Sequence, residues 1–168
     1  MEVWMTMRRV VMYIVAGFAA WFGMQAVHEL GHVLAAWVTG GMVQRVVLHP
    51  FAISHTDVSH NPHPLVVAWA GPLVGVNLPL AMAAFNRFGF SAGRRYLDFF
   101  AGFCLIANGA YIGVGSIDAV GDAGDMLRHG SPRWLLAAFG ILSATCGLWI
   151  WHRQTQRESA PPTPSAES

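Results

Sequence analysis

Four apolar stretches, each about as long as a bilayer is thick, constrain this chain most. They cover residues 10–38, 65–85, 96–117 and 134–151. A membrane-spanning helix needs about 20 predominantly apolar residues. Lipid offers no hydrogen-bond partner to an exposed backbone, so such stretches cross the bilayer as helices. The sequence therefore predicts an all-α membrane protein, a bundle of about four transmembrane helices.

The composition supports a membrane protein. Hydrophobic residues make up 54% of the chain and charged residues 11%, whereas a soluble domain has roughly 25% charged residues. The formal net charge is only +1, so no basic face suggests a nucleic-acid partner. The lipid bilayer is the expected surrounding. The first stretch is too long for a signal peptide and has no A-x-A-like cleavage site, which favours a retained span.

The connecting segments suggest one domain with a short tail. Residues 43–48 form an apolar, β-prone run after the first span, and they predict a small β-hairpin or strand. Residues 1–152 are expected to form a single transmembrane domain. Residues 153–168 are polar and rich in proline and serine, which is typical of a disordered tail.

All ten basic residues are arginines, and their distribution predicts the topology. Four spans would place seven arginines on the side that holds both termini and three on the other side. Positive charge favours the cytoplasmic side, so both termini are expected in the cytoplasm. The two groups are Arg8, Arg9, Arg87, Arg94, Arg95, Arg153 and Arg157, and Arg45, Arg128 and Arg133.

The string His28-Glu29-Leu30-Gly31-His32 lies inside the first apolar stretch. Residues four apart on a helix lie about 40° apart around the axis and about 6 Å along it, so both imidazoles can reach one metal ion. Glu29 then lies beside the metal as a general base for a metal-bound water. An acid at the centre of a span costs about 2.5–3.5 kcal/mol, which favours a functional role. The alternative is a polar cap in an interfacial turn.

A catalytic zinc site needs a third protein ligand. His28 lies about 27 Å along a helix that starts at Val10, toward the far side of the membrane. The third apolar stretch reaches the same side near Gly115, where an acidic segment begins. Asp122 and Asp125 in that segment are both candidates for the third ligand, although a solvated loop or helix cap also accounts for such acids.

Three motifs carry a resemblance to the site-2 protease family of intramembrane zinc metalloproteases, in particular its small bacterial, peptidase M50B-like members. The HELGH string fits the HExGH form of the family. Residues 70–73 (AGPL) look like its AGP motif, and residues 121–127 (GDAGDML) are similar to its LDG motif. In that register Asp122 would be the third ligand. Gly121 and Ala123 replace the usual leucine and glycine, so Asp125 stays an alternative.

The resemblance implies a zinc metalloendopeptidase with one Zn²⁺ per chain, in a bacterial cell membrane. Its substrates would be membrane proteins or peptides, cut in or near the bilayer, and a regulatory membrane partner is possible in such a system. The asparagine that binds substrate would be Asn77 or Asn108. Familiar members open their site toward the cytosol, whereas the arginine distribution here places it near the opposite face.

Other functions use the same residues. A zinc carrier or sensor would need the ligands without hydrolysis, but the almost wholly apolar segment 13–25 argues against transport. A protease-like scaffold would not need Glu29.

The run 43–48 could pair with an extended substrate or be a surface hairpin. Gly31 could leave room beside the metal or serve helix packing. The histidines His49, His55, His60 and His63 suggest either a second metal site or, given their irregular spacing, a loop.

Overall fold

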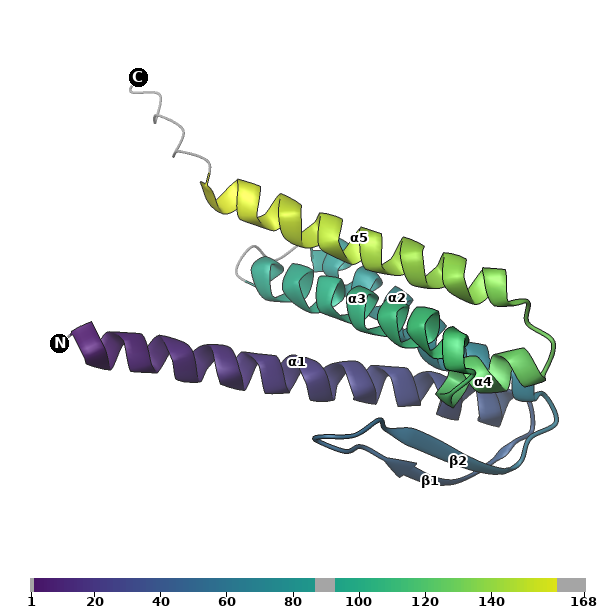
Figure 1. The fold of residues 1–168 in the computed structure, drawn as a ribbon. Coiled ribbons are helices and arrows are strands. Elements are labelled where there is room, and N and C mark those ends of the chain that lie inside the picture. Colours follow the sequence, from purple (N-terminus) through teal and green to yellow (C-terminus); the bar gives the residue numbers. More distant parts are fainter. Residues whose placement is uncertain (1, 87–92, 160–168) are drawn as a thin grey trace.

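The computed structural model describes residues 2–86 and 93–159. The chain is mostly helical, with one hairpin after the first helix (Figure 1). Four helices are long and apolar enough to cross a membrane, consistent with a multi-pass membrane protein. The predicted fold class is thereby confirmed. In chain order the elements are α1 (Glu2–Val38), β1 (Met42–Val47), β2 (His55–His60), α2 (Pro64–Phe85), α3 (Arg94–Asp118), α4 (Gly121–Arg128) and α5 (Arg133–Ser159).

The breaks between these elements follow from local backbone chemistry. Gly40 has a φ of +80° just after α1, a conformation that glycine adopts without a steric penalty. Pro64 occupies the first turn of α2, where its missing N–H costs no hydrogen bond. Ala119 and Gly121 have φ values of 55° and 56°, and this left-handed pair turns the chain sharply between α3 and α4. The turn brings the acidic segment back over the end of the bundle.

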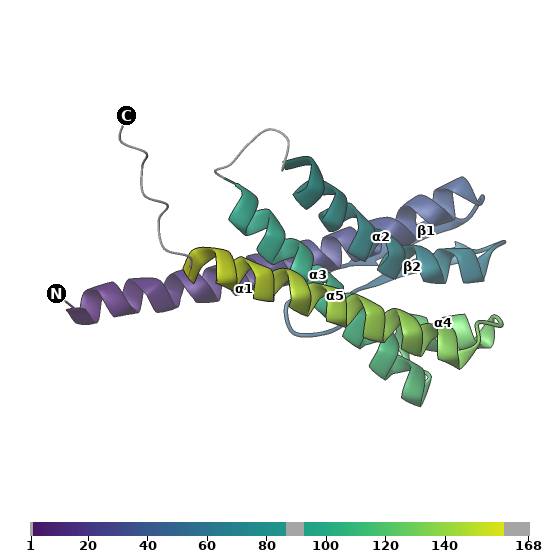
Figure 2. The same ribbon diagram turned by 90° about the horizontal axis from the view of Figure 1, so that it is seen from above.

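The long helices form layers, with α3 in the middle. It packs most extensively against α5 and also contacts α2, while α1 packs mainly against α2. Figure 2 shows α5 in front of α3, with α1 behind them. The start of α1 and the end of α5 lie at one end of the bundle, and α4 lies at the other end (Figure 1). Buried side chains of α2, α3, α4 and α5 meet at the α4 end in one cluster of Ala68, Ile112, Ala123, Met126 and Leu136.

The hairpin runs back along α1 (Figure 1). Its two strands pair antiparallel, with Val46 opposite Thr56. The connecting loop is fixed to α1 by Gln25, whose side chain donates to the carbonyl oxygen of His49 (3.1 Å) and accepts from its N–H (3.3 Å). The hairpin is therefore held beside the middle of the first span, at the level of the HELGH string.

The end of the chain differs from the prediction. Residues 153–159 belong to α5 and are not part of a disordered tail. Arginine, glutamine and glutamate are good helix formers, so their polarity does not end a helix that has already begun. The rest of the predicted tail, residues 160–168, lies outside the described residues, as does Arg87 from the arginine count.

Candidate metal centre

Three residues of α1 form the base of the site. His28, Glu29 and His32 are 4%, 2% and 6% exposed, although they lie in a helix whose N-terminal half is largely exposed. The Nε2 atoms of the two histidines are 3.1 Å apart, as expected for imidazoles one helical turn apart that turn toward one point. The helix therefore presents a pair of ring nitrogens to the interior of the bundle.

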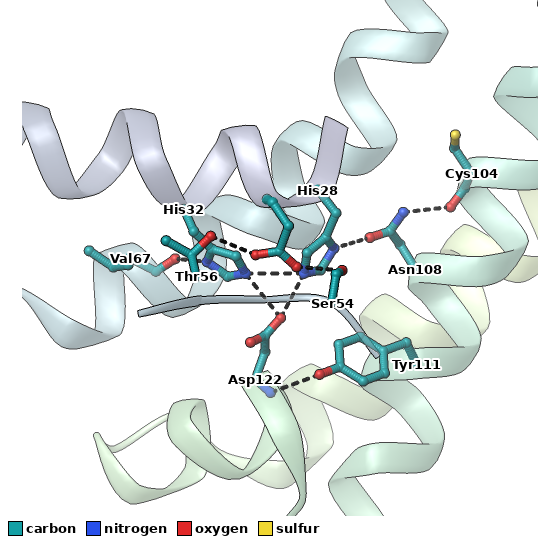
Figure 3. A network of polar contacts seen from close by, with 10 residues as sticks. His28, His32, Ser54, Thr56, Val67, Cys104, Asn108, Tyr111 and Asp122 are labelled. Carbon is teal, nitrogen blue, oxygen red and sulfur yellow. Dashed lines mark hydrogen bonds and ion pairs between the residues drawn. The ribbon is translucent and has the colours of Figure 1, made fainter. Parts of the chain in front are cut away.

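Asp122 completes a triangle with these nitrogens (Figure 3). Its Oδ2 atom lies 2.7 Å from Nε2 of His28 and 3.2 Å from Nε2 of His32. In a tetrahedral zinc site with bonds of about 2.0–2.1 Å, neighbouring ligand atoms are about 3.3 Å apart. The triangle is slightly smaller, so small movements of the side chains would admit the ion. Asp122 lies in the first turn of α4, and its N–H donates to the hydroxyl oxygen of Tyr111 (3.3 Å).

The other ring nitrogens show that the triangle suits a cation. Nδ1 of His28 lies 2.6 Å from Oδ1 of Asn108, and Nδ1 of His32 lies 2.7 Å from the carbonyl oxygen of Val67. Both partners are acceptors, so each Nδ1 carries the proton and each Nε2 has a free lone pair. Two lone pairs and a carboxylate oxygen thus point at one another with no proton among them. Such an arrangement is typical of metal-ligating histidines with an oriented outer shell.

The protonation state of Asp122 suits a ligand. Burial alone would raise the pKa of its carboxyl group, but the contacts with His28 and His32, which become hydrogen bonds when an imidazole gains a proton on Nε2, lower that pKa well below its usual range. The carboxylate is therefore ionised at neutral pH. Within residues 2–86 and 93–159, these three residues form the single group of three or more histidine, cysteine or acidic side chains that could hold a metal ion.

Glu29 points toward the hairpin and is held by two hydroxyl groups. Oγ of Ser54 donates to one carboxylate oxygen (2.6 Å), and Oγ1 of Thr56 donates to the other (2.7 Å). Both donors come from the hairpin, one just before β2 and one within it (Figure 3). The carboxylate is thus fixed beside the histidine pair without being part of the triangle.

Glycines of α2 make room for this site. A Cβ atom on Gly71 would clash with the ring of His32 and lie 2.8 Å from Nε2 of His28. A Cβ atom on Gly75 would lie 2.7 Å from Oδ1 of Asn108. Gly31 faces the backbone of Ala70 and Gly71, so it serves the packing of α1 against α2. The glycine of the AGP motif, and not Gly31, leaves the space beside the ligand atoms.

The alternatives that the sequence left open lie in different surroundings in the structure. Asp125 lies outside the triangle and forms an ion pair with Arg128 on the surface of α4. Asn77 is exposed and donates to the carbonyl oxygen of Leu73 in its own helix (2.8 Å). Asn108 is buried against His28. The histidines of the hairpin region (His49, His55, His60 and His63) belong to no second group of metal-ligating residues among those described.

Sequence reasoning missed the two hydroxyls that hold Glu29. Ser54 and Thr56 are two apart, which puts them on one face of an extended segment. That spacing alone is common, and only the pairing of the hairpin with α1 brings the hydroxyls to Glu29. Tyr111 of α3 is a further residue of the site, because its hydroxyl oxygen accepts from the backbone N–H of Asp122.

Comparisons with known proteins agree with this geometry. Searches of curated proteins and of solved structures found no match. A family model described as Peptidase M50B-like matches residues 3–112. The match includes both histidines and Glu29 and ends before Asp122, which joins the site through the fold. Because the match covers more than half of the 168 residues, the chain belongs to the Peptidase M50B-like family.

Proposed function

We propose that this protein is an intramembrane zinc metalloprotease that hydrolyses peptide bonds of membrane-embedded or membrane-proximal substrates. One observation carries the proposal. Two buried imidazole nitrogens and a partly buried carboxylate oxygen converge on a point beside an acid, Glu29, that is not among them. A site that only bound zinc would need the three ligands but would have no need of a fixed carboxylate beside them.

Each residue of the site has its own role in the proposed reaction. His28, His32 and Asp122 would hold the ion, and Asn108 and Val67 keep the imidazoles turned toward it. A zinc ion bound there would polarise the scissile carbonyl group and lower the pKa of a coordinated water. Glu29 accepts a proton from the attacking water and delivers it to the nitrogen of the leaving amine. Ser54 and Thr56 hold both carboxylate oxygens in place for these transfers.

The strand next to the site is β2. A cavity of about 520 Å³ borders the triangle, and residues 54–58 form part of its wall, whereas no residue of β1 does. An extended substrate would therefore lie along β2. The sequence had suggested the run 43–48 for this pairing. Strand addition would hold the peptide in an open conformation that exposes a bond to the site.

The position of the site suggests its side of the membrane. Asp122 lies in the first turn of α4, and α4 lies at the end of the bundle opposite the start of α1 and the end of α5 (Figure 1). With the termini in the cytoplasm, as the arginines indicate, the site would be near the non-cytoplasmic face. Membrane-tethered proteins or peptides that emerge on that face are the proposed substrates.

Chelation and reconstitution test the proposal. The protein, purified in detergent or lipid nanodiscs, is stripped of metal and assayed on a panel of single-span model substrates. Cleavage should disappear on chelation and return with one equivalent of Zn²⁺ per chain. Cleavage that survives complete removal of metal would contradict the proposal.

A further inference from the structure

Glu29 stands between two cavities of different character. The smaller one, about 260 Å³, is walled by Trp21, Met24, Ile53 and Ala107 and reaches Glu29, His28 and Asn108. The larger one, about 520 Å³, also borders Glu29. Glu29, Ile53, Ser54 and Tyr111 line both. A peptide whose scissile bond lies at Glu29 would have one flank at each cavity.

The walls of the larger cavity are mainly polar on the hairpin and on α4. Besides Glu29 and His32, this cavity is lined by His55, Thr56, Asp57, Asn61, Asp122, Asp125 and His129. The smaller cavity is instead lined mainly by apolar groups, among them an indole, a thioether and two aliphatic side chains, with Gln25 as a further polar residue. The chemistry of the lining therefore changes from polar to apolar across Glu29.

The two cavities also differ in depth along the bundle. Trp21 lies seven residues before His28 on α1, which is about 10 Å toward the end of the bundle where α1 begins. Ala107 lies one turn before Tyr111 in the same direction on α3. The larger cavity instead includes the start of α2 and residues of α4, at the opposite end of the bundle. The apolar cavity thus faces the interior of the span, and the polar cavity faces its end.

We infer that the smaller cavity, formed by Trp21, Met24, Ile53 and Ala107, is the specificity pocket for an apolar side chain next to the scissile bond. The inference rests on the proposed protease function and defines its substrate class. The substrate is a segment that is apolar on the side toward the membrane interior and polar on the other, cut where the two meet. An apolar side chain of the substrate enters the pocket, and the polar flank lies along β2.

The size of the pocket suits this role. An engineered cavity of about 150 Å³ lined by aliphatic and aromatic side chains binds benzene. The pocket is larger than that, and it accommodates a leucine or phenylalanine side chain. In a hydrophobic pocket, one methylene group changes selectivity by about 10- to 200-fold. A substitution that fills the pocket therefore has a measurable effect on which substrates are cut.

The test fills the pocket from α3. Ala107→Leu replaces a methyl group with an isobutyl group at the pocket wall, and Ala110→Leu makes the same change on the exposed face of the same helix. The substrates are single-span peptides that differ only in the residue on the membrane side of the cut, which is leucine or alanine. The ratio of kcat/KM for the leucine to the alanine substrate should fall at least tenfold in Ala107→Leu. It should not change in Ala110→Leu.

Peptide binding gives a second readout without catalysis. In a Glu29→Gln background, the Kd for the leucine peptide should rise at least tenfold with Ala107→Leu, while the zinc content stays the same. An unchanged substrate preference together with an unchanged Kd would contradict the inference that the smaller cavity is a specificity pocket. Loss of co-purifying lipid in Ala107→Leu, with peptide binding unaffected, would make the cavity a lipid site and also overturn it.

The two proposals fail in different ways. If the wild type cleaves peptides and Ala107→Leu lowers the rate for all substrates alike, the protease function stands and the pocket is wrong. If the wild type binds zinc and cleaves nothing, the protease function is wrong. The Kd of the leucine peptide then shows whether the smaller cavity binds an apolar side chain, because binding does not need hydrolysis.

Discussion

Oδ1 of Asn108 lies 2.6 Å from Nδ1 of His28, which joins α3 to α1 across 80 positions of sequence. The orientation of the amide is itself fixed, because its Nδ2 donates to the carbonyl oxygen of Cys104 (2.9 Å). The oxygen of Asn108 therefore faces the imidazole, and Nε2 of His28 faces Asp122. This buried amide determines which nitrogen of His28 is free to bind a metal.

Asn108→Ala should weaken zinc binding by about 10- to 100-fold, the usual effect of losing an outer-shell partner of a metal-ligating histidine. The measurement is the zinc Kd by competition with a chelator of known affinity. Asn77→Ala, which removes an exposed amide from α2, is the matched control and should leave the Kd unchanged. Equal effects of the two variants would show that Asn108 does not act through His28.

Asp122→Ala should abolish stoichiometric zinc, because it removes one of three ligand atoms. Asp125→Ala should keep about one zinc per chain, since the carboxylate of Asp125 pairs with Arg128 instead. Metal analysis of the two purified proteins decides between the acids. Zinc lost from Asp125→Ala and kept by Asp122→Ala would reverse the assignment.

The double variant Ser54→Ala/Thr56→Val should retain zinc but lose cleavage activity by about 10- to 100-fold. A hydrogen bond to a charged group contributes about 1.5–3 kcal/mol, and here two such bonds hold Glu29. The single variant Thr56→Ser, with Ser54 intact, keeps the hydroxyl and should retain most of the wild-type cleavage rate. Ser59→Ala, on the exposed part of β2, serves as the control. A fall in kcat with little change in KM would indicate an effect on the base and not on substrate binding.

Gly71→Ala should destabilise the protein by about 1–3 kcal/mol, as overpacking does, and displace the imidazoles so that zinc binding falls. Gly17→Ala adds the same methyl group to α1 where nothing lies within 4 Å. Because alanine is about 1 kcal/mol better than glycine inside a helix, Gly17→Ala should be neutral or stabilising. Thermal unfolding in detergent measures both. Two variants with the same sign of effect would contradict the role of Gly71.

Much of the fold could be predicted from the sequence because the bilayer imposes a simple rule. Apolar length predicted four spans, and a β-prone run after the first predicted the hairpin; the structure has both. The end of α5 was harder to predict, because Arg153 to Ser159 are polar without being helix breakers. The helix continues there on its own propensity.

Part of the candidate site could also be predicted from the sequence, and part could not. His28, Glu29 and His32 are recognisable locally, since their spacing alone puts them on one turn of helix. The choice between Asp122 and Asp125 depends on the turn at Ala119 and Gly121, which no spacing rule determines. The hydroxyls of Ser54 and Thr56 reach Glu29 because the hairpin folds back on α1, where Gln25 binds its loop. Contacts between distant segments of the chain cannot be predicted from spacing and become visible only in the folded structure.

The most direct test measures zinc content and cleavage on the same preparations of the wild type and Glu29→Gln. Zinc near one per chain in both proteins, with cleavage of single-span substrates by the wild type alone, is the predicted result. It would show that the triangle holds the metal and that Glu29 acts on the water. Well-folded wild-type protein that contains no metal, and takes up none when Zn²⁺ is supplied, would contradict the account.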